Sequence, residues 1–295
     1  MSYPRSKRGH FPSADQDARS AKEQEIRSQC ASPSYKLAFQ DPDFLLRDEL
    51  RPVRLQLELL KPELVLQEEG IESTVVVYGS ARLLDPETAN RRLESARALA
   101  AENPEDKTAA RELQRAEQSL KNSRYFEEAR KLGKLISSNT GPNKMVVITG
   151  GGAGIMGAAN QGAHDAGAKS IGMNIVLPHE QEPNRYITPE LCFQFHYFAI
   201  RKMHLLMRAK AMVAFPGGFG TLDELFETIT LVQTGKIEPF PILLFGKDFW
   251  NRLVDFQFLV DQGTISAQDL ELFQYVETAE EAWEIICRGN GLPFS

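Results

Sequence analysis

The segment at residues 216–224, with the sequence PGGFGTLDE, contains the residue types that would hold a phosphate. It follows the apolar run AMVAF and precedes the helical pattern ETITLVQ, so it joins a strand to a helix. Glycines bring bare backbone close to a ligand, and the amides at a helix N-terminus bind anions. A structural alternative is a capping box, with Thr221 at the N-cap and Glu224 at position N3. Because such a box requires neither the leading PGG nor Gly220, we expect a ligand-binding turn.

A second glycine-rich turn, GGGAGIMGAAN at residues 150–160, follows the apolar run KMVVIT and also opens a helix. The same argument predicts an anion site there. Gly152, Gly154 and Gly157 satisfy the GxGxxG pattern of dinucleotide sites. However, that fingerprint belongs after the first strand of its unit, and the acid expected about 20 residues later is missing. We therefore favour phosphate binding, with purely structural glycines and dinucleotide binding as the alternatives.

The two motifs together, PGGxGTxxE and GGGxGxMG, resemble those of the LOG ("Lonely Guy") family of nucleotide phosphoribohydrolases. The resemblance covers roughly residues 72–250. It implies a Rossmann-like fold, a homodimer or larger homo-oligomer, and hydrolysis of a nucleoside 5'-monophosphate to free base and ribose 5-phosphate. Many members carry the label lysine decarboxylase. The sequence shows no signature of the Schiff-base lysine and ring-nitrogen partner that pyridoxal chemistry needs.

The resemblance also implies roles for particular side chains. The family's catalytic arginine lies in an Arg-Lys pair before the PGG turn, here Arg201-Lys202, and its catalytic glutamate ends the PGGxGTxxE motif, here Glu224. Breaking an N-glycosidic bond builds positive charge on the ribose and negative charge on the base, which a carboxylate and a cation stabilise. We expect neither a metal nor a cofactor. The expected substrate-binding residues are Gly217, Gly218, Gly220, Thr221, Lys202, Ser80, Arg82, Gly151 and Gly152.

The segment 172–184, GMNIVLPHEQEPN, departs from short plant-type members and resembles longer bacterial ones. Because it is expected near the base, the substrate stays open between AMP and a cytokinin riboside 5'-monophosphate. His179 in this segment is a further candidate site residue. The alternative to an enzyme is a non-catalytic carrier that resembles the molybdenum-cofactor carrier proteins. The presence of both Arg201 and Glu224 favours the enzyme.

Buried apolar runs that alternate with helical patterns would position these turns. Such alternation is typical of parallel strands joined through helices. The sequence therefore predicts an α/β protein with a Rossmann-like, doubly wound parallel sheet in three α/β/α layers. The expected strands are residues 74–78, 144–149, 170–176, 193–197, 211–215 and 240–245.

Three further parts are expected along the chain. Residues 1–40 are polar and cannot bury enough surface to offset the entropy of ordering, so we expect a mobile tail. Residues 41–70 predict a helical arm, in which Pro42 begins a helix and Pro52 and Pro62 restart the chain. Residues 71–295 form the expected catalytic domain, with a helical hairpin inserted at about 87–125.

The composition narrows the possible partners and compartments. A formal net charge of -6 and a pI near 5.6 disfavour nucleic acid as a partner. Cys30, Cys192 and Cys287 form no CxxC pair, which indicates a reducing compartment. The N-terminal residues lack the apolar stretch of a signal peptide, and no run of about 18 apolar residues occurs. We therefore expect a cytoplasmic protein without a membrane partner.

Overall fold

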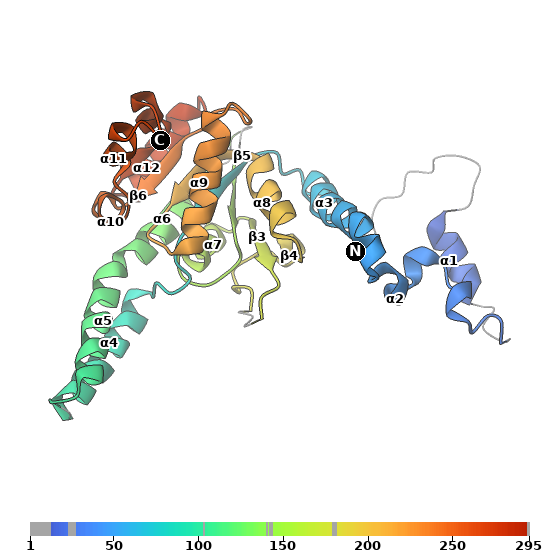
Figure 1. Cartoon of the computed structure of the whole chain (residues 1–295), viewed down its shortest axis with the longest axis horizontal. Helices are drawn as coiled ribbons and strands as arrows, with labels where there is room; N and C mark the ends of the chain where they lie inside the picture. Colours follow the sequence, from blue (N-terminus) through green and yellow to red (C-terminus); the bar gives the residue numbers. More distant parts are fainter. Residues whose placement is uncertain are drawn as a thin grey trace. The chain divides into compact units, whose positions relative to one another are not determined.

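The computed structural model of the chain describes residues 13–22, 28–102, 104–139, 141, 144–178 and 182–293. The chain divides into two compact units, Met1–Leu60 and Lys61–Ser295 (Figure 1). No described helix has both the length and the apolar composition needed to span a lipid bilayer.

The first unit consists of short helical pieces. Asp41 caps α2 by accepting a hydrogen bond from the Phe44 amide at 3.4 Å. The mobility expected for residues 1–40 stays a prediction, and residues 1–12 and 23–27 lie outside the described part. The helices are α1 (Ala14–Lys22), α2 (Pro42–Leu45) and the beginning of α3 (Arg51–Glu68), with 3-10 turns at Pro33–Tyr35, Ala38–Gln40 and Asp48–Leu50.

One expectation for the arm is wrong. Pro62 was expected to restart the chain, but it lies inside α3 and is buried. A proline in a helix interior removes one backbone hydrogen bond. The helix nevertheless continues past it to Glu68.

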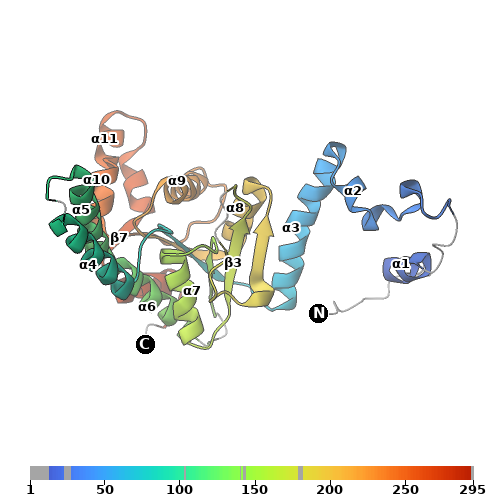
Figure 2. The same cartoon turned by 90° about the horizontal axis from the view of Figure 1, so that it is seen from below.

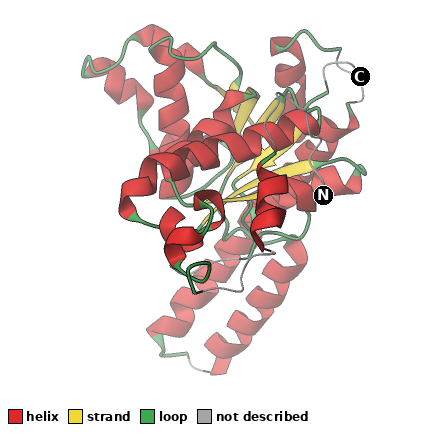
Figure 3. Cartoon of the chain, turned by 90° about the vertical axis from the view of Figure 1, so that its right-hand side faces the viewer, coloured by secondary structure: helices red, strands yellow, loops and turns green. Residues whose placement is uncertain are grey.

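The second unit is built on a seven-stranded, all-parallel sheet with the strand order β4-β3-β2-β1-β5-β6-β7. Figure 3 shows these strands between helices. This confirms the predicted α/β fold class. The three-residue edge strand β7 was not predicted. The strands are β1 (Thr74–Tyr78), β2 (Val146–Thr149), β3 (Ser170–Ile175), β4 (Cys192–Phe195), β5 (Ala209–Ala214), β6 (Ile242–Phe245) and β7 (Gln274–Val276).

The central strand β1 is buried on both faces, and its side chains alternate between them. Val75 and Val77 pack with α6 (Arg124–Ser138), α7 (Ile155–Asp165) and α12 (Ala279–Gly289). Val76 and Tyr78 face the opposite cluster, which includes α8 (Phe198–Met207) and α9 (Phe219–Gln233). The sheet is therefore the middle of three layers.

The helices that follow β1 and β5 lie on opposite faces of the sheet. These two strands are neighbours. From β1 the chain adds strands toward one edge of the sheet, and from β5 it adds them toward the other. In open α/β sheets, ligands bind at the carboxyl ends of strands at such a switch point. The loops after β1, β2 and β5 are therefore where a site is expected.

Between β1 and α6 the chain forms the predicted helical hairpin. Helices α4 (Pro86–Glu102) and α5 (Lys107–Asn122) pack side by side and project from the sheet (Figures 1 and 2). The remaining helical elements are α10 (Lys247–Leu253), α11 (Phe256–Asp261) and the 3-10 segments Pro189–Leu191 and Ala267–Leu272.

Candidate active site

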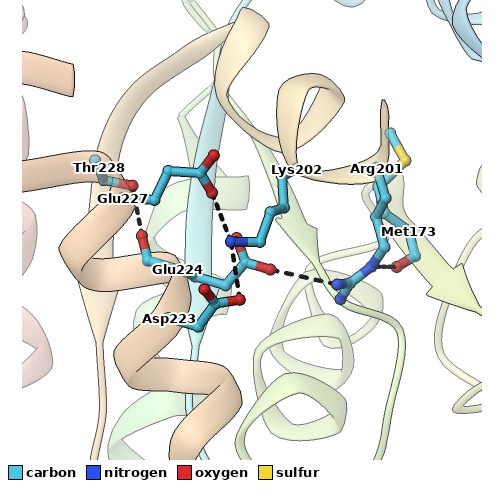
Figure 4. A network of polar contacts seen from close by, with 7 residues as sticks. All are labelled: Met173, Arg201, Lys202, Asp223, Glu224, Glu227 and Thr228. Carbon is cyan, nitrogen blue, oxygen red and sulfur yellow. Dashed lines mark hydrogen bonds and ion pairs between the residues drawn. The ribbon is translucent and has the colours of Figure 1, made fainter. Parts of the chain in front are cut away.

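The structure brings the two predicted catalytic residues into contact. Arg201 on α8 places its Nη1 atom 3.3 Å from Oε1 of Glu224 on α9 (Figure 4). The Nε atom of Arg201 donates to the carbonyl of Met173, within β3, at 2.7 Å. A Cβ atom at Gly150 would lie 2.6 Å from Nη2 of Arg201, so a glycine at that position makes room for the guanidinium.

Both side chains of this pair are buried, with 10% of Arg201 and 6% of Glu224 exposed. Burial raises the pKa of the Glu224 carboxyl, while the charges of Arg201 and Lys202 lower it, and the net direction is upward. A buried ion pair contributes little to stability, because desolvation offsets the attraction. A buried acid with a perturbed pKa beside a cation is instead typical of functional sites.

Lys202 approaches the same carboxylate from the other side. Its Nζ atom lies 3.9 Å from Oε2 of Glu224, but its close partners are Asp223 at 2.8 Å and Glu227 at 2.7 Å (Figure 4). These contacts tie α8 to α9. The substrate-binding role of Lys202 stays a prediction, and a ligand would have to compete with three carboxylates for its ammonium group.

The turn after β5 begins helix α9 earlier than the sequence indicated. Gly218 is the N-cap, without a side-chain cap hydrogen bond, so the alternative of a capping box with Thr221 at the N-cap and Glu224 at N3 is wrong. A Cβ atom at Gly217 would lie 2.1 Å from the Thr221 hydroxyl oxygen, so Thr221 packs over Gly217 and the helix begins before it. Glu224 is therefore inside the helix, where its side chain is free to meet Arg201.

The same turn leaves backbone open to solvent. Gly218 and Gly220 are exposed, and a Cβ atom at either would meet nothing within 4 Å. Their amides belong to the first turn of α9, whose N–H groups have no intrahelical acceptor. The positive end of the helix dipole adds to the attraction for an anion. This open helix N-terminus is adjacent in sequence to Glu224.

The turn after β2 is closed by its own contacts. The Gly151 amide donates to the hydroxyl of Thr149 at 3.0 Å. Nδ2 of Asn184 donates to the carbonyl oxygens of Gly151 and Gly152 at 3.1 and 3.0 Å. These contacts hold the turn in place at Gly151 and Gly152, while Ala153 is exposed.

The loop after β1 links the other two turns. The Ser80 amide donates to the Pro216 carbonyl at 3.0 Å, and the Ser80 carbonyl accepts from the Ile155 amide at 3.1 Å. The Ser80 hydroxyl accepts from the Arg82 amide at 3.1 Å, and the Arg82 side chain is exposed. Ser80 therefore lies where the loops after β1, β2 and β5 contact one another, and Arg82 lies on the surface beside them.

A cavity of about 800 Å³ in the second unit borders Ala81, Ala153 and Gly154. Neither Arg201 nor Glu224 lines it. The chemistry is therefore assigned from the buried charged pair and not from the size of a cavity.

Sequence reasoning missed Asn184, the Met173 carbonyl and Tyr78. Asn184 is 33 residues from Gly151, so no local pattern links them. Tyr78 is the last residue of β1, and strand alternation could have placed its side chain on the face of α8 and α9. His179 lies outside the described residues.

Known proteins similar to this chain include plant enzymes. A family model described as "Possible lysine decarboxylase" matches residues 156–286. Cytokinin riboside 5'-monophosphate phosphoribohydrolase LOG3 of Arabidopsis thaliana is 35% identical over 167 residues, covering 55% of this chain and 74% of that protein. The phosphoribohydrolase LOG4 of the same plant is 36% identical over 141 residues, covering 46% of this chain and 63% of that protein.

Among solved structures, the molybdenum cofactor carrier protein of Chlamydomonas reinhardtii is 16% identical. The match covers 74% of this chain and 99% of that chain, with a TM-score of 0.42. A likeness of that size carries no argument about function.

Proposed function

The chain belongs to the LOG family of phosphoribohydrolases, and from this premise we propose that it hydrolyses the N-glycosidic bond of a purine nucleoside 5'-monophosphate. The products are the free base and ribose 5-phosphate. The observation that carries the proposal is the buried contact between Arg201 and Glu224, beside an open helix N-terminus. AMP and cytokinin riboside 5'-monophosphates are the two candidate substrates.

In the proposed reaction the 5'-phosphate binds the exposed amides at the start of α9, which fixes the ribose near Glu224. The bond between C1' and the base nitrogen breaks, and the oxygen of a water molecule forms a bond to C1'. One proton of that water is released to solvent, and the base takes up a proton as it leaves. The ionised Glu224 carboxylate stabilises the positive charge that develops on the ribose.

The role of Arg201 follows from its contacts. Its charge lowers the pKa of a carboxyl whose burial raises it, so Arg201 favours the ionised form that the reaction requires. Its position against Gly150 and its contact with Glu224 also keep a cation beside the turn after β2. We assign to it the stabilisation of negative charge on the substrate.

Incubation with a panel of nucleoside 5'-monophosphates, followed by chromatography for free base, tests the proposal. The panel contains AMP and a cytokinin riboside 5'-monophosphate, with the matching nucleosides as controls. We expect base release from at least one monophosphate and much slower release from its nucleoside, because the phosphate supplies binding energy. Tight binding without release would instead support a non-catalytic carrier.

The predicted homo-oligomer is a separate proposal. Phe198, Met203 and Met207 on α8 expose 50%, 49% and 45% of their surface, which makes this helix the expected contact between copies. Light scattering of the purified chain would measure the assembly directly, and a monomer would contradict the proposal.

A further inference from the structure

Tyr78 is a buried residue at the candidate site that the proposed reaction does not use. It ends β1, directly before the loop containing Ser80, and only 4% of it is exposed. Strand alternation directs its side chain to the face covered by α8 and α9, the helices that carry Arg201 and Glu224. The phenol therefore lies on the sheet side of the charged pair.

The hydroxyl group of Tyr78 is fully buried and makes no hydrogen bond of good distance and angle, although the Glu224 carboxylate is near enough to raise the pKa of the phenol as an acceptor. A buried polar group without a partner costs about 1–3 kcal/mol, and phenylalanine would fill the same space without that cost. A hydroxyl kept in such a place calls for an explanation in function.

The charged surroundings indicate which group the hydroxyl would serve. Burial raises the pKa of the Tyr78 phenol, and the negative charge of Glu224 raises it further. Arg201 opposes this shift, while Glu227 adds to it. The phenol thus stays protonated at physiological pH and can act as a donor, and the Glu224 carboxylate is the acceptor that influences it most.

We propose that Tyr78 is a positioning residue, whose hydroxyl donates a hydrogen bond to the Glu224 carboxylate when a nucleotide is bound. The proposal rests on the proposed function. In the free protein Arg201 holds Oε1 of Glu224 at 3.3 Å. An anionic substrate attracts Arg201 away from that oxygen, and the phenol then holds the carboxylate from the sheet side. The other charged groups facing this carboxylate are Lys202 on α8 and Asp223 and Glu227 on α9.

The test compares Tyr78→Phe, which removes one oxygen atom, with Tyr275→Phe. Tyr275 lies in β7 of the same sheet, and the pKa of its phenol is raised by burial. For Tyr78→Phe we expect kcat to fall about 10- to 100-fold with little change in KM, because only transition-state positioning is lost. The acid limb of the pH–rate profile should move to higher pH, since the ionised carboxylate loses a donor. The melting temperature should change little, and Tyr275→Phe should leave kcat and the profile unchanged.

A second readout does not depend on turnover. Titration of the Glu224 carboxyl by carbon-13 NMR, assigned with Glu224→Gln and recorded with ribose 5-phosphate present, should give a higher pKa in Tyr78→Phe than in the wild type. If wild-type protein releases no base, the proposed function fails, and this titration alone decides the role of Tyr78. An unchanged pKa in Tyr78→Phe overturns the proposal, as does an unchanged kcat and acid limb in an active enzyme.

Discussion

The two glycine-rich turns look alike in sequence but differ in structure. In the turn after β2, the amide of Gly151 and the carbonyls of Gly151 and Gly152 are engaged by Thr149 and Asn184. In the turn after β5, Gly218 and Gly220 face open space. We infer that the first turn is a scaffold and that the second receives the ligand.

The difference teaches that glycine serves two purposes here. Gly151 and Gly154 have positive φ angles of 81° and 63°, which other residues rarely adopt. A Cβ atom at Gly154 would also lie 2.3 Å from the Ser80 carbonyl oxygen. Gly220 has neither constraint, so its lack of a side chain gives access to the backbone and is not needed for the fold.

The largest expected effect concerns Glu224, beside the open turn. Glu224→Gln should lower kcat by about 10²- to 10⁴-fold, because glutamine cannot stabilise a ribosyl cation by charge. Glutamine keeps the shape and removes a charge whose burial is costly, so the melting temperature should change by less than about 5 °C. Steady-state kinetics and calorimetry check this, with Glu238→Gln on the loop after α9 as the control. Full turnover would reduce Glu224 to a structural role.

Substitutions in the turn after β2 should mainly lower the stability of the fold. Gly154→Ala places a methyl group against the Ser80 backbone at a positive φ angle, so the free energy of unfolding should fall by about 2–4 kcal/mol. Urea denaturation measures the change. Gly167→Ala is the control, because Gly167 also has a positive φ angle, of 66°, but would meet no neighbouring atom. Equal losses in both variants would show that the close packing of Gly154 contributes nothing.

Substitution of Asn184 tests whether its hydrogen bonds stabilise the turn after β2. Asn184→Ala removes the donor shared by two glycine carbonyls, so the free energy of unfolding should fall by about 1–3 kcal/mol. Turnover of the folded variant should stay within about tenfold of the wild type if this turn only supports the site. A collapse of activity without loss of stability would contradict the scaffold role.

Substitutions in the turn after β5 should weaken nucleotide binding and leave the stability of the fold unchanged. Gly220→Ala puts a methyl group into open space within a helix, so the free energy of unfolding should stay the same or rise by up to about 1 kcal/mol. KM for the nucleotide should rise by about tenfold, because the methyl group obstructs the approach of the phosphate. Calorimetric binding of ribose 5-phosphate provides the same comparison without chemistry. Unchanged affinity would place the phosphate elsewhere.

The smallest expected effect is a shift in pH dependence. Because the pKa of Glu224 is raised, the acid limb of kcat/KM should lie above the ordinary range of a glutamate. Between the ordinary and the raised pKa the folded state holds the proton more tightly, so the contribution of Glu224 to stability falls as pH rises through that window. Lys202→Met removes a nearby cation and should move the acid limb further upward, while Lys236→Met at the far end of α9 should not. An acid limb at the position of a free glutamate would contradict the burial effect.

Much of this fold could be predicted from the sequence, because the strands are short, mostly apolar runs, and β1, β2 and β6 end directly before a glycine. The strand β7 was not predicted, because it has only three residues and one of them is the polar Gln274. Arg201 and Glu224 were singled out only through the family motifs, and their contact was not predicted, since 23 residues separate them.

The details of the turns could not be predicted in the same way. The start of α9 was misplaced because Gly-Phe-Gly has low helix propensity, although the helix begins at Phe219. The closure of the first turn by Asn184 depends on a contact distant in sequence. Composition alone therefore could not distinguish the scaffold turn from the open one.

A crystal structure of Glu224→Gln with AMP tests the central claim most directly, because the slow variant should retain the intact nucleotide. We predict phosphate oxygens at about 3 Å from backbone amides of the Gly218–Thr221 turn, and the ribose beside residue 224. A phosphate bound instead to the turn at residues 150–154, with the ribose remote from residue 224, would contradict the account.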